Sequence, residues 1–505
     1  MSKVKIKIGP LIDKNKQLTH DSREMANLLS EQYTKVFSNP IQATSGSSPQ
    51  KTFTKPFERL MFTPDDLIKA IDELSSTAAA GPDSFPAILL KCCKSELVKP
   101  LHKLWNLSLH EGYVPLQLKK SIITPIHKGG SKANPANYRP ISLTSHLIKI
   151  FEKVMRNHLA SHITENNLFN PNQHGFRSGH SCLSELLDHY DFILNLLNEN
   201  KNVDVVYLNF AKAFDKVDFG IVIDKIKLLG INSNELHWIT SFLRNRTQTV
   251  VVNGIKSDSM PVVSGVPQGS VLGPLIFLIL IGDIDDNVEN ASVRSFADDT
   301  RAAYGIRHLR DITKLQLDLN AIYGWTDENN MKLNDSKFEL LRYGKDEIIK
   351  LCTHYFTPSD SLITEKSVVK DLGILMSSCA NFTDHINSVI EKGKQLTSWI
   401  LRSFRSREQL VMLTLWKSLV LPTIEYCSVL WSPSKIYQIQ SIEHLQWSFV
   451  RKIKGTADLN YWQCLQKLKM YSLQRRRERY AIIYVWKILE GLAPNVNSLV
   501  SAKTD

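Results

Sequence analysis

The stretch that decides the fold is Val293 to Tyr304, which reads Val-Arg-Ser-Phe-Ala-Asp-Asp-Thr-Arg-Ala-Ala-Tyr. Its first half alternates along the chain as a β-strand does, and two adjacent carboxylates, Asp298 and Asp299, follow. Aspartate is unfavourable in strands and common in turns, so the pattern predicts a hairpin with both acids at its tip. Two neighbouring carboxylates repel each other, and a divalent cation relieves that repulsion.

The chain has two further Asp-Asp pairs, which have simpler explanations. Asp65-Asp66 follows Thr63-Pro64 and suits a helix start, where acids interact favourably with the helix dipole. Asp285-Asp286 is typical of a solvated loop. Only the third pair lies inside a strand pattern, just after the apolar run Val271–Ile281. From spacing alone, acids that only decorate a turn stay the alternative to a metal site.

Composition indicates a globular protein with a basic surface. The chain has 505 residues, which is enough for roughly two to four domains. Its content of 43% hydrophobic and 22% charged residues is ordinary for a globular protein. The net charge of +12 favours a polyanionic partner. Seven scattered cysteines argue against a disulfide framework or a zinc knuckle, and for a reducing compartment. The sequence has no signal peptide and no run of transmembrane length, so we expect a cytoplasmic or nuclear location and no membrane partner.

Several elements can be predicted from local pattern. A helix is expected at about Ser22–Phe37, followed by a Ser/Gly/Pro/Thr-rich linker from Asn39 to Lys55. Val203–Phe210 is the strongest strand signal. A second strand, Thr247–Val252, ends at Asn253-Gly254, a type I′ hairpin signal, and its expected partner is about Ser259–Val263.

The chain from about residue 380 onward is predicted to be mostly helical. Apolar spacing near 3.6 residues predicts helices over 386–401, 407–421 and 436–453. The cationic run Arg475–Arg479 is more typical of a solvated helix face than of a nuclear-localisation signal. Six tryptophans are expected in the core rather than as stacking platforms. They are Trp399, Trp416, Trp431, Trp447, Trp462 and Trp486. Basic residues that could track a phosphate backbone are Arg402, Arg405, Arg407, Lys452 and Lys454.

Nine blocks of sequence occur in one order, and together they carry a family resemblance. They are Gly81-Pro82-Asp83, Pro125–Lys128, Asn137–Leu143, Gln173–Arg177, Lys212–Asp215, Gly265–Pro274, Phe296–Thr300, Lys332-Leu333-Asn334 with Lys337, and Asp371-Leu372-Gly373. Over about residues 60 to 380 the chain resembles the reverse transcriptases of non-long-terminal-repeat (non-LTR) retrotransposons, most closely the jockey-like group. Weaker similarity continues through Tyr426–Trp431. A group II intron maturase or a telomerase catalytic subunit fits these blocks less well.

The resemblance implies an α+β right-hand polymerase with fingers, an antiparallel-sheet palm, a helical thumb and a helical C-terminal region. The expected segments are an N-terminal extension and linker (1–60), fingers and the start of the palm (61–200), palm (201–345), and palm end, thumb and C-terminal region (346–505). The reverse transcriptase domain overall would span about 108–376. Family members usually carry an endonuclease ahead of the polymerase, and residues 1–60 have no room for one. We therefore interpret the chain as a fragment of a longer element protein, without a ribonuclease H signature after residue 380.

The resemblance also implies synthesis of DNA on template RNA, from a DNA primer and deoxynucleoside triphosphates, with two Mg²⁺ ions. Two ions a few ångströms apart activate the primer hydroxyl and neutralise the leaving pyrophosphate. Asp298 and Asp299 match two of the three metal-binding aspartates, and Lys337 matches a lysine near the leaving phosphate. The substrate-binding matches are Arg139 and Lys128 for the triphosphate, Phe214 for the sugar, and Gln268 and Gly269 for the nascent pair and template. From spacing alone, Lys128 and Arg139 would be ordinary surface cations.

One position departs from the family pattern. The first metal-binding aspartate of the family falls at the end of the Val203–Phe210 strand, where this sequence has Asn209. An amide oxygen can ligate magnesium but brings no charge. Asp204 lies five positions earlier, on the opposite strand face, and Asp215 belongs to a separate family position. We therefore expect impaired polymerisation on an intact fold, and the alternative is an inactive nucleic-acid-binding relic.

Overall fold

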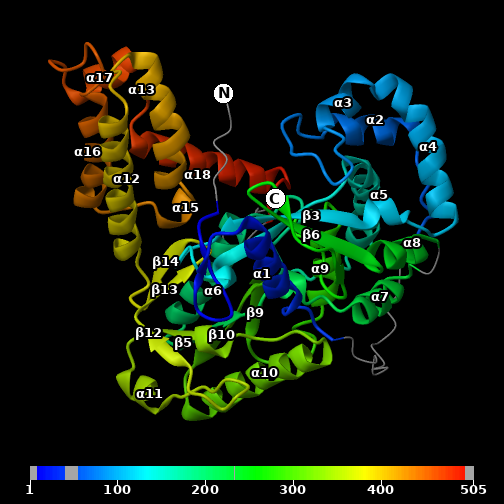
Figure 1. Cartoon of the computed structure of the whole chain (residues 1–505). Helices are drawn as coiled ribbons and strands as arrows, with labels where there is room; N and C mark the ends of the chain where they lie inside the picture. The colour runs from blue at the N-terminus through cyan, green and yellow to red at the C-terminus, as the bar shows by residue number, and fades with distance from the viewer. Residues whose placement is uncertain (1–7, 40–54, 232–233, 495–505) are drawn as a thin grey trace. The chain divides into compact units, whose positions relative to one another are not determined.

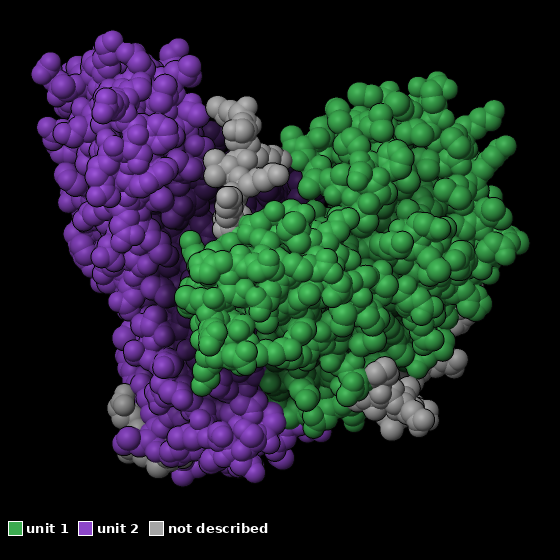
Figure 2. Space-filling view, viewed as in Figure 1, with its two compact units in different colours: residues 1–171, 210–287, 321–333 green, residues 172–209, 288–320, 334–505 purple. Residues whose placement is uncertain are grey.

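The computed structural model describes residues 8–39, 55–231 and 234–494 (Figure 1). These residues divide into two compact units (Figure 2). Unit 1 comprises residues 1–171, 210–287 and 321–333, and unit 2 comprises 172–209, 288–320 and 334–505. The chain therefore passes from one unit to the other several times. Most of the expected linker, 40–54, lies outside the described residues.

Unit 1 contains a mixed sheet of strand order β4-β3-β6-β7, with β8 also paired to β6. Its strands are β3 (Lys120–His127), β4 (Tyr138–Leu143), β6 (Arg246–Val252), β7 (Ile255–Lys256) and β8 (Met260–Val262). Strands β3 and β4 are antiparallel, whereas β6 runs parallel to β3. A short pair, β1 (Leu11–Ile12) and β2 (Leu18–Thr19), precedes them.

The hairpin after β6 has a shorter partner than the sequence predicted. Asn253 and Gly254 both have positive φ, as a type I′ turn requires, so Val252 lies directly opposite Ile255. The immediate partner is therefore β7. The expected partner, 259–263, does pair with β6 as β8, but at the start of that strand, where Arg246 faces Val262.

The described part of unit 1 contains eight complete α-helices, the first of which begins at Ser22, as the sequence predicted. They are α1 (Ser22–Thr34), α2 (Pro64–Asp72), α3 (Ala87–Cys92), α4 (Lys94–His110), α5 (His146–Glu165), α7 (Phe219–Leu228), α8 (Asn234–Leu243) and α9 (Gly273–Ile281). Thr63 and Asp66 form a capping box at the start of α2, which confirms the Asp65-Asp66 pair as a helix start. Asp285-Asp286 lies in turns after α9, where Asp285 accepts a hydrogen bond from Asn170 (2.6 Å).

Helix α1 is part of the unit 1 core. Met25, Leu29 and Tyr33 are buried on its inner face, and they pack against Ile123 of β3 and Val250 of β6. The 3.6-residue spacing of these side chains places them on one side of the helix. The segment before the first sequence block therefore contributes to the sheet's hydrophobic cover.

Unit 2 contains a five-stranded sheet of order β12-β11-β5-β10-β9. Its strands are β5 (Asn202–Asn209), β9 (Ser292–Phe296), β10 (Asp299–Ile306), β11 (Glu339–Tyr343) and β12 (Thr364–Lys366). All neighbours are antiparallel except β11 and β12. Strand β5 is central and its residues 202–206 are all buried, which explains its strong apolar signal. Two further strands, β13 (Val368–Asp371) and β14 (Ile374–Ser377), form a separate hairpin.

The rest of unit 2 is helical, as predicted (Figure 1). Its helices are α6 (Cys182–Asn198), α11 (Glu347–Cys352), α12 (Thr383–Ser403), α13 (Gln409–Leu415), α14 (Leu421–Ile424), α15 (Ser428–Trp431), α16 (Ile436–Val450), α17 (Tyr461–Leu468) and α18 (Leu473–Leu489), while α10 (Leu309–Glu328) begins in unit 2 and ends in unit 1. The helix expected over 407–421 is continued by a π-helical turn, Trp416–Val420, into α14. Pro422 has no N–H to donate to the preceding turn, which accounts for the widened turn before it.

The expectation that all six C-terminal tryptophans are in the core is wrong for three of them. Trp416 and Trp431 are fully buried, and Trp447 is partly buried against the same core. Three are exposed by 47 to 67%: Trp399, Trp462 and Trp486. Trp399 directly precedes the buried Ile400 on α12, so the helix turns it toward solvent. In the described part of the chain, no helix is both long and apolar enough to cross a membrane.

Candidate active site

Asn209 and Asp299 lie opposite each other on neighbouring strands of unit 2. They are paired residues in the antiparallel register of β5 and β10. Side chains at directly opposite positions share one face, with Cβ atoms about 4.5–5.5 Å apart. Asp298 precedes Asp299 in the two-residue turn that joins β9 to β10. The structure therefore brings the three predicted metal-binding positions together, at one end of the central strands.

The turn that carries Asp298 is held by Gln173. Ala297, the first turn residue, has a φ of 56°. The Gln173 side chain accepts a hydrogen bond from the Ala297 N–H (2.8 Å) and donates one to the Ala297 carbonyl (3.2 Å). Its oxygen also accepts from the Gly175 N–H (2.8 Å), and a Cβ at Gly175 would lie 2.4 Å from the Ala297 nitrogen. Glycine is therefore required for this close approach.

The charges around Asp299 come from this sheet and a neighbouring turn. Although Asp299 is exposed as a residue, partial desolvation raises the pKa of its carboxyl, while Arg301 and Lys337 oppose that rise. Lys337 ends the 3₁₀ turn Asp335–Lys337. The residue before that turn, Asn334, donates its N–H to the Asn209 carbonyl at 2.7 Å. The turn that carries Lys337 is thus joined to the end of β5 by the hydrogen bond from Asn334.

Two nearby aspartates do not replace the missing carboxylate. Asp204 is 2% exposed, and it accepts a hydrogen bond from the Tyr355 hydroxyl at 2.8 Å. Strand alternation places it on the other face from Asn209. Burial raises the pKa of Asp204 to about 6. Asp215 belongs to unit 1, where it accepts a hydrogen bond from the Gln268 side chain (2.9 Å).

The predicted substrate-binding residues are gathered within unit 1 around Asp215. Burial raises the pKa of the Asp215 carboxyl, whereas the Gln268 hydrogen bond and the cations Lys212, Arg139 and Lys128 lower it. Lys128 and Arg139 are both exposed. Lys128 directly follows β3 and Arg139 is the second residue of β4, so both lie at the loop end of the β3–β4 hairpin. This cluster includes the acid that the sequence interpretation had set aside.

The loop Ser264–Ser270 lies against this cluster. Its Val266 N–H donates to the Phe214 carbonyl (2.9 Å), and the Phe214 ring stacks on Phe277 of α9 at 4.4 Å between centroids. The Gln268 carbonyl accepts from the Ser142 N–H of β4 (2.8 Å). Gly269 has a φ of +134°, and a Cβ there would meet the Ser142 carbonyl oxygen at 2.4 Å. The structure therefore brings Phe214, Gln268 and Gly269 together with the two cations.

The family model for reverse transcriptase (RNA-dependent DNA polymerase) matches residues 126–375. This chain contains a reverse transcriptase domain. The domain includes every predicted site residue from Lys128 to Lys337. A polymerase fold follows from it, and the mixed helices and sheets confirm the α+β class.

The relatives carry names that agree with the motif resemblance. A probable RNA-directed DNA polymerase from transposon X-element of Drosophila melanogaster is 27% identical over 83% of this chain and 49% of its own length. The RNA-directed DNA polymerase from mobile element jockey of the same species is 27% identical over 78% of this chain and 44% of its own length. The chain thus spans about half the length of these relatives. The resemblance to reverse transcriptases of non-LTR retrotransposons is confirmed.

The donor atoms of the reverse transcriptase domain suit magnesium by type. Two carboxylates and one amide oxygen are hard oxygen ligands. Within the described ranges, no group of three or more His, Cys, Asp or Glu side chains is arranged to hold a metal ion. The set at 209, 298 and 299 therefore fits a divalent cation but is one negative charge short of three carboxylates.

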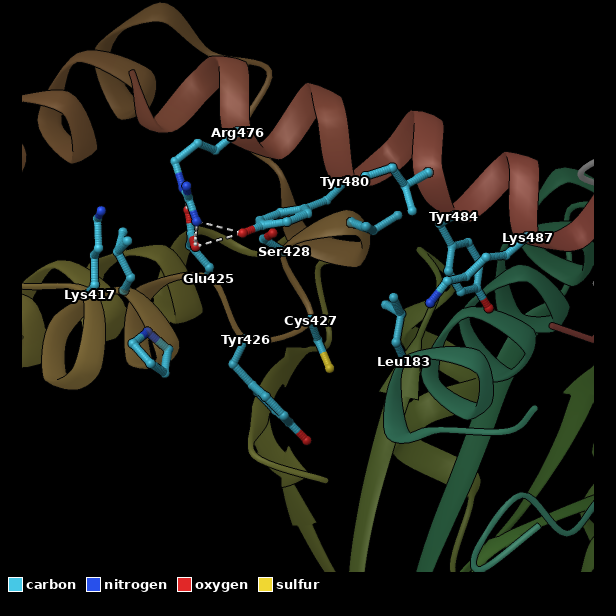
Figure 3. Close-up of a pocket in the computed structure, with 14 residues that line it drawn as sticks. Leu183, Lys417, Glu425, Tyr426, Cys427, Ser428, Arg476, Tyr480, Tyr484 and Lys487 are labelled. Atoms are coloured by element: carbon cyan, nitrogen blue, oxygen red, sulfur yellow. Dashed lines mark hydrogen bonds and ion pairs between the residues drawn. The ribbon is translucent and has the colours of Figure 1, made fainter. Parts of the chain in front are cut away.

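Unit 2 also contains a cavity of about 650 Å³ that none of the predicted site residues lines (Figure 3). Helix α18 forms one wall, and Glu425 to Val429 form another. Arg476 pairs with Glu425, with one contact at 2.8 Å, and donates to the Tyr480 hydroxyl at 2.6 Å (Figure 3). Arg477 is 3% exposed. The run Arg475–Arg479 is therefore not the uniformly solvated helix face that the sequence indicated, because its central arginines are paired or buried.

Proposed function

We propose that this chain is the polymerase part of a non-LTR retrotransposon protein, copying template RNA into DNA from a DNA primer and deoxynucleoside triphosphates. The pairing of Asn209 with Asp299, next to Asp298, carries the proposal. It also supports the second part, that Asn209 impairs polymerisation. In this assignment, the unit 2 sheet is the palm core, the β3–β4 hairpin belongs to the fingers, and the helices from α12 onward form the thumb.

The residues of each cluster then have separate roles. Asp298, Asp299 and the Asn209 amide oxygen would hold magnesium, which when bound activates the primer hydroxyl and neutralises the leaving pyrophosphate. Arg139 and Lys128 bind triphosphate oxygens, for which arginine's planar fork is well shaped. Lys337 places a positive charge beside Asp299, near the leaving phosphate. These ionic contacts act by positioning and charge stabilisation.

Three uncharged residues complete the proposed substrate site. The Phe214 ring is fixed against Phe277, and we assign it to the sugar 2′-position, where it would crowd a ribose 2′-hydroxyl. Gln268 and the exposed backbone at Gly269 support the nascent base pair and the template. Gln268 is held by hydrogen bonds to Asp215 and Ser142, and the Gly269 backbone packs closely against the Ser142 carbonyl oxygen, so the surface they present is preorganised.

The loss of one carboxylate explains the expected impairment. At about 4 Å and an effective dielectric near 20, one carboxylate charge contributes about 4 kcal/mol to cation binding for each unit of charge on the cation. An amide oxygen recovers part of that energy as a neutral ligand. We therefore expect a loss on the order of a hundredfold or more in extension rate, since 1.36 kcal/mol is tenfold.

Primer extension on an RNA template tests both parts of the proposal. The protein is compared with Asn209→Asp, which restores the third carboxylate, and with Asn209→Asp carrying Asp299→Asn as the matched loss. We expect Asn209→Asp to extend primers about a hundredfold faster, on the scale of 1.36 kcal/mol per tenfold, and the double variant to fall back. Equal extension by the protein and by Asn209→Asp would show that Asn209 does not impair it.

The second candidate function is a catalytically inactive nucleic-acid-binding relic of the same fold. Asn209 is the observation that favours it. Under this alternative, Asn209→Asp stays inactive while template–primer binding, measured by fluorescence anisotropy, is retained. Restored extension by Asn209→Asp excludes it.

A further inference from the structure

Glu152 is a buried acid whose hydrogen bonds go to the loop that carries Gln268 and Gly269. It lies on α5 with no exposed surface. One carboxylate oxygen accepts hydrogen bonds from the Ser270 hydroxyl, from the Val271 N–H (2.7 Å) and from the Leu272 N–H (3.0 Å). The acceptor and its donors lie 118 to 120 residues apart in the chain.

These contacts hold Val271 and Leu272, the two residues just before helix α9 begins at Gly273. The first N–H groups of a helix have no partner inside it and require an acceptor from outside. Besides its bond to Glu152, the Ser270 hydroxyl accepts from the Gly273 N–H at 2.9 Å. Glu152 and Ser270 together therefore fix where the loop ends and the helix begins.

Burying a carboxylate costs free energy, so an acid at this buried position of α5 calls for an explanation. Burial raises the pKa of Glu152, and the bonds from Ser270, Leu272 and Val271, together with nearby Lys149, lower it. The hydrogen bonds to one of its two oxygens offset part of this cost. An apolar side chain would fill the same space without holding the loop.

The fixed end lies one residue beyond Gly269. On its other side the loop is held by the Ser142 N–H on the Gln268 carbonyl and by the Gln268 side chain on Asp215. Glu152 holds the end of the loop at Ser270 and the two residues that follow it. The backbone between these anchors has little freedom to move away from β4.

We propose that Glu152 is a positioning residue of the nucleotide site: through Ser270 and the start of α9, it sets the Gln268–Gly269 surface against which the incoming nucleotide pairs. It touches no substrate itself. This inference rests on the proposed function, because that function assigns Gln268 and Gly269 to the nascent pair.

The test measures nucleotide binding without chemistry, so it does not require the extension step that Asn209 is proposed to impair. A dideoxy-terminated primer on an RNA template is bound to the protein, and the Kd for the next correct deoxynucleotide is measured. Glu152→Ala loses all three bonds, and we expect its Kd to rise about tenfold, which corresponds to about 1.4 kcal/mol. Template–primer affinity should stay unchanged. Glu152→Gln keeps an acceptor oxygen and should bind nucleotide as the unmodified chain does.

Glu235 provides the matched control. It is also fully buried, on α8 of the same unit, and it accepts the Leu60 N–H at 2.7 Å, away from the loop. Glu235→Ala should lower Tm without changing the nucleotide Kd. Should Glu152→Ala not fold, Ser270→Ala removes one anchor and the hydrogen bond to the Gly273 N–H, and it should raise the Kd severalfold.

Two results would overturn the inference. If Glu152→Ala, or Ser270→Ala in its place, lowers Tm but leaves the nucleotide Kd unchanged, as Glu235→Ala does, then Glu152 is a structural residue only. If the unmodified chain binds no nucleotide on the blocked primer, the proposed function fails first and the positioning role fails with it. The two failures are distinguished because the second already occurs without any substitution.

Discussion

At the scale of single residues, the geometry of the proposed metal site depends on side chains that hold the backbone rather than on the acids alone. Asp298 follows a residue with positive φ, which a non-glycine residue adopts only when its surroundings impose it. Gln173 supplies that constraint by bonding both polar groups of Ala297. The spacing of the two acids therefore depends on an uncharged side chain 124 positions away.

We predict that Gln173→Ala weakens divalent-metal binding at the hairpin. The loss of three buried hydrogen bonds frees the turn and should cost about 1–3 kcal/mol of unfolding free energy. Mn²⁺ binding, followed by electron paramagnetic resonance in the Asn209→Asp background, should weaken. Gln446→Ala removes a buried glutamine of the same unit that bonds Tyr461 and Tyr471, and it should reduce stability with unchanged Mn²⁺ affinity. Equal Mn²⁺ affinities in all three proteins would rule out the role of Gln173.

A second residue-scale prediction concerns pH. Burial raises the pKa of Asp204 from 3.8 to about 6, although Arg342 and the Tyr355 hydroxyl oppose the rise. The folded state thus holds this proton more tightly than the unfolded chain. The stability it contributes is present below pH 3.8 and is lost as pH rises through about 6, roughly 3 kcal/mol at 1.36 kcal/mol per pKa unit.

Asp204→Asn does not titrate, and its amide oxygen can still accept from Tyr355. We therefore expect this variant to lose less unfolding free energy between pH 4 and pH 7 than the unmodified chain. Urea unfolding at several pH values measures the difference. Parallel stability curves for the two proteins would show that Asp204 does not have the raised pKa.

At the scale of elements, helix α1 supports the sheet that carries Arg139 and Lys128. Leu29 is fully buried against β3 and β6 in the core that it shares with Tyr33. We predict that Leu29→Ala lowers the free energy of unfolding by about 2–5 kcal/mol, the range for a buried leucine truncation. The partly buried neighbour Leu28 is the control, and Leu28→Ala should cost less. Similar losses in urea unfolding would show that α1 does not contribute to the core through this face.

Local pattern predicted most elements, because their signals are short in range. The β9–β10 hairpin, central strand β5 and the start of α2 were all readable from alternation, turn residues and capping. The anchors Gln173 and Glu152 were not, because their partners are more than 100 residues away. Gln173 lies inside one of the nine sequence blocks, which marked the residue but did not reveal its hydrogen bonds to Ala297. The exposed Trp399, Trp462 and Trp486 show that helix rotation decides burial, which composition does not reveal.

At the scale of the whole molecule, the net charge of +12 suits a nucleic-acid substrate. In unit 2, three exposed cations flank the ends of α12 and α16: Arg402, Arg405 and Lys452. Arg407 is instead bonded to the Leu401 carbonyl (2.8 Å), and Lys454 pairs with Glu408 (2.8 Å). Of the five predicted phosphate-tracking cations, two are therefore engaged by other groups of the protein, and the other three are exposed.

We predict that replacing these three cations by alanine weakens template–primer binding and its salt dependence. Each phosphate contact contributes about 0.7–0.9 to the slope of log K against log salt, so the slope should fall by about 2. Anisotropy titrations at several salt concentrations measure it. Lys227→Ala, whose ammonium already pairs with Asp224 (2.7 Å), should leave the slope unchanged. An unaltered slope in the triple variant would place the nucleic acid elsewhere.

The position of β5 in its sheet has a consequence for synthesis on the ribosome. One neighbour, β10, is made about a hundred residues after β5, and the other, β11, only begins at Glu339. Until then the most apolar strand of the sheet presents an open edge, which is a template for aggregation. A premature stop codon anywhere before β11 would therefore yield an incomplete, aggregation-prone polypeptide rather than a shorter functional protein.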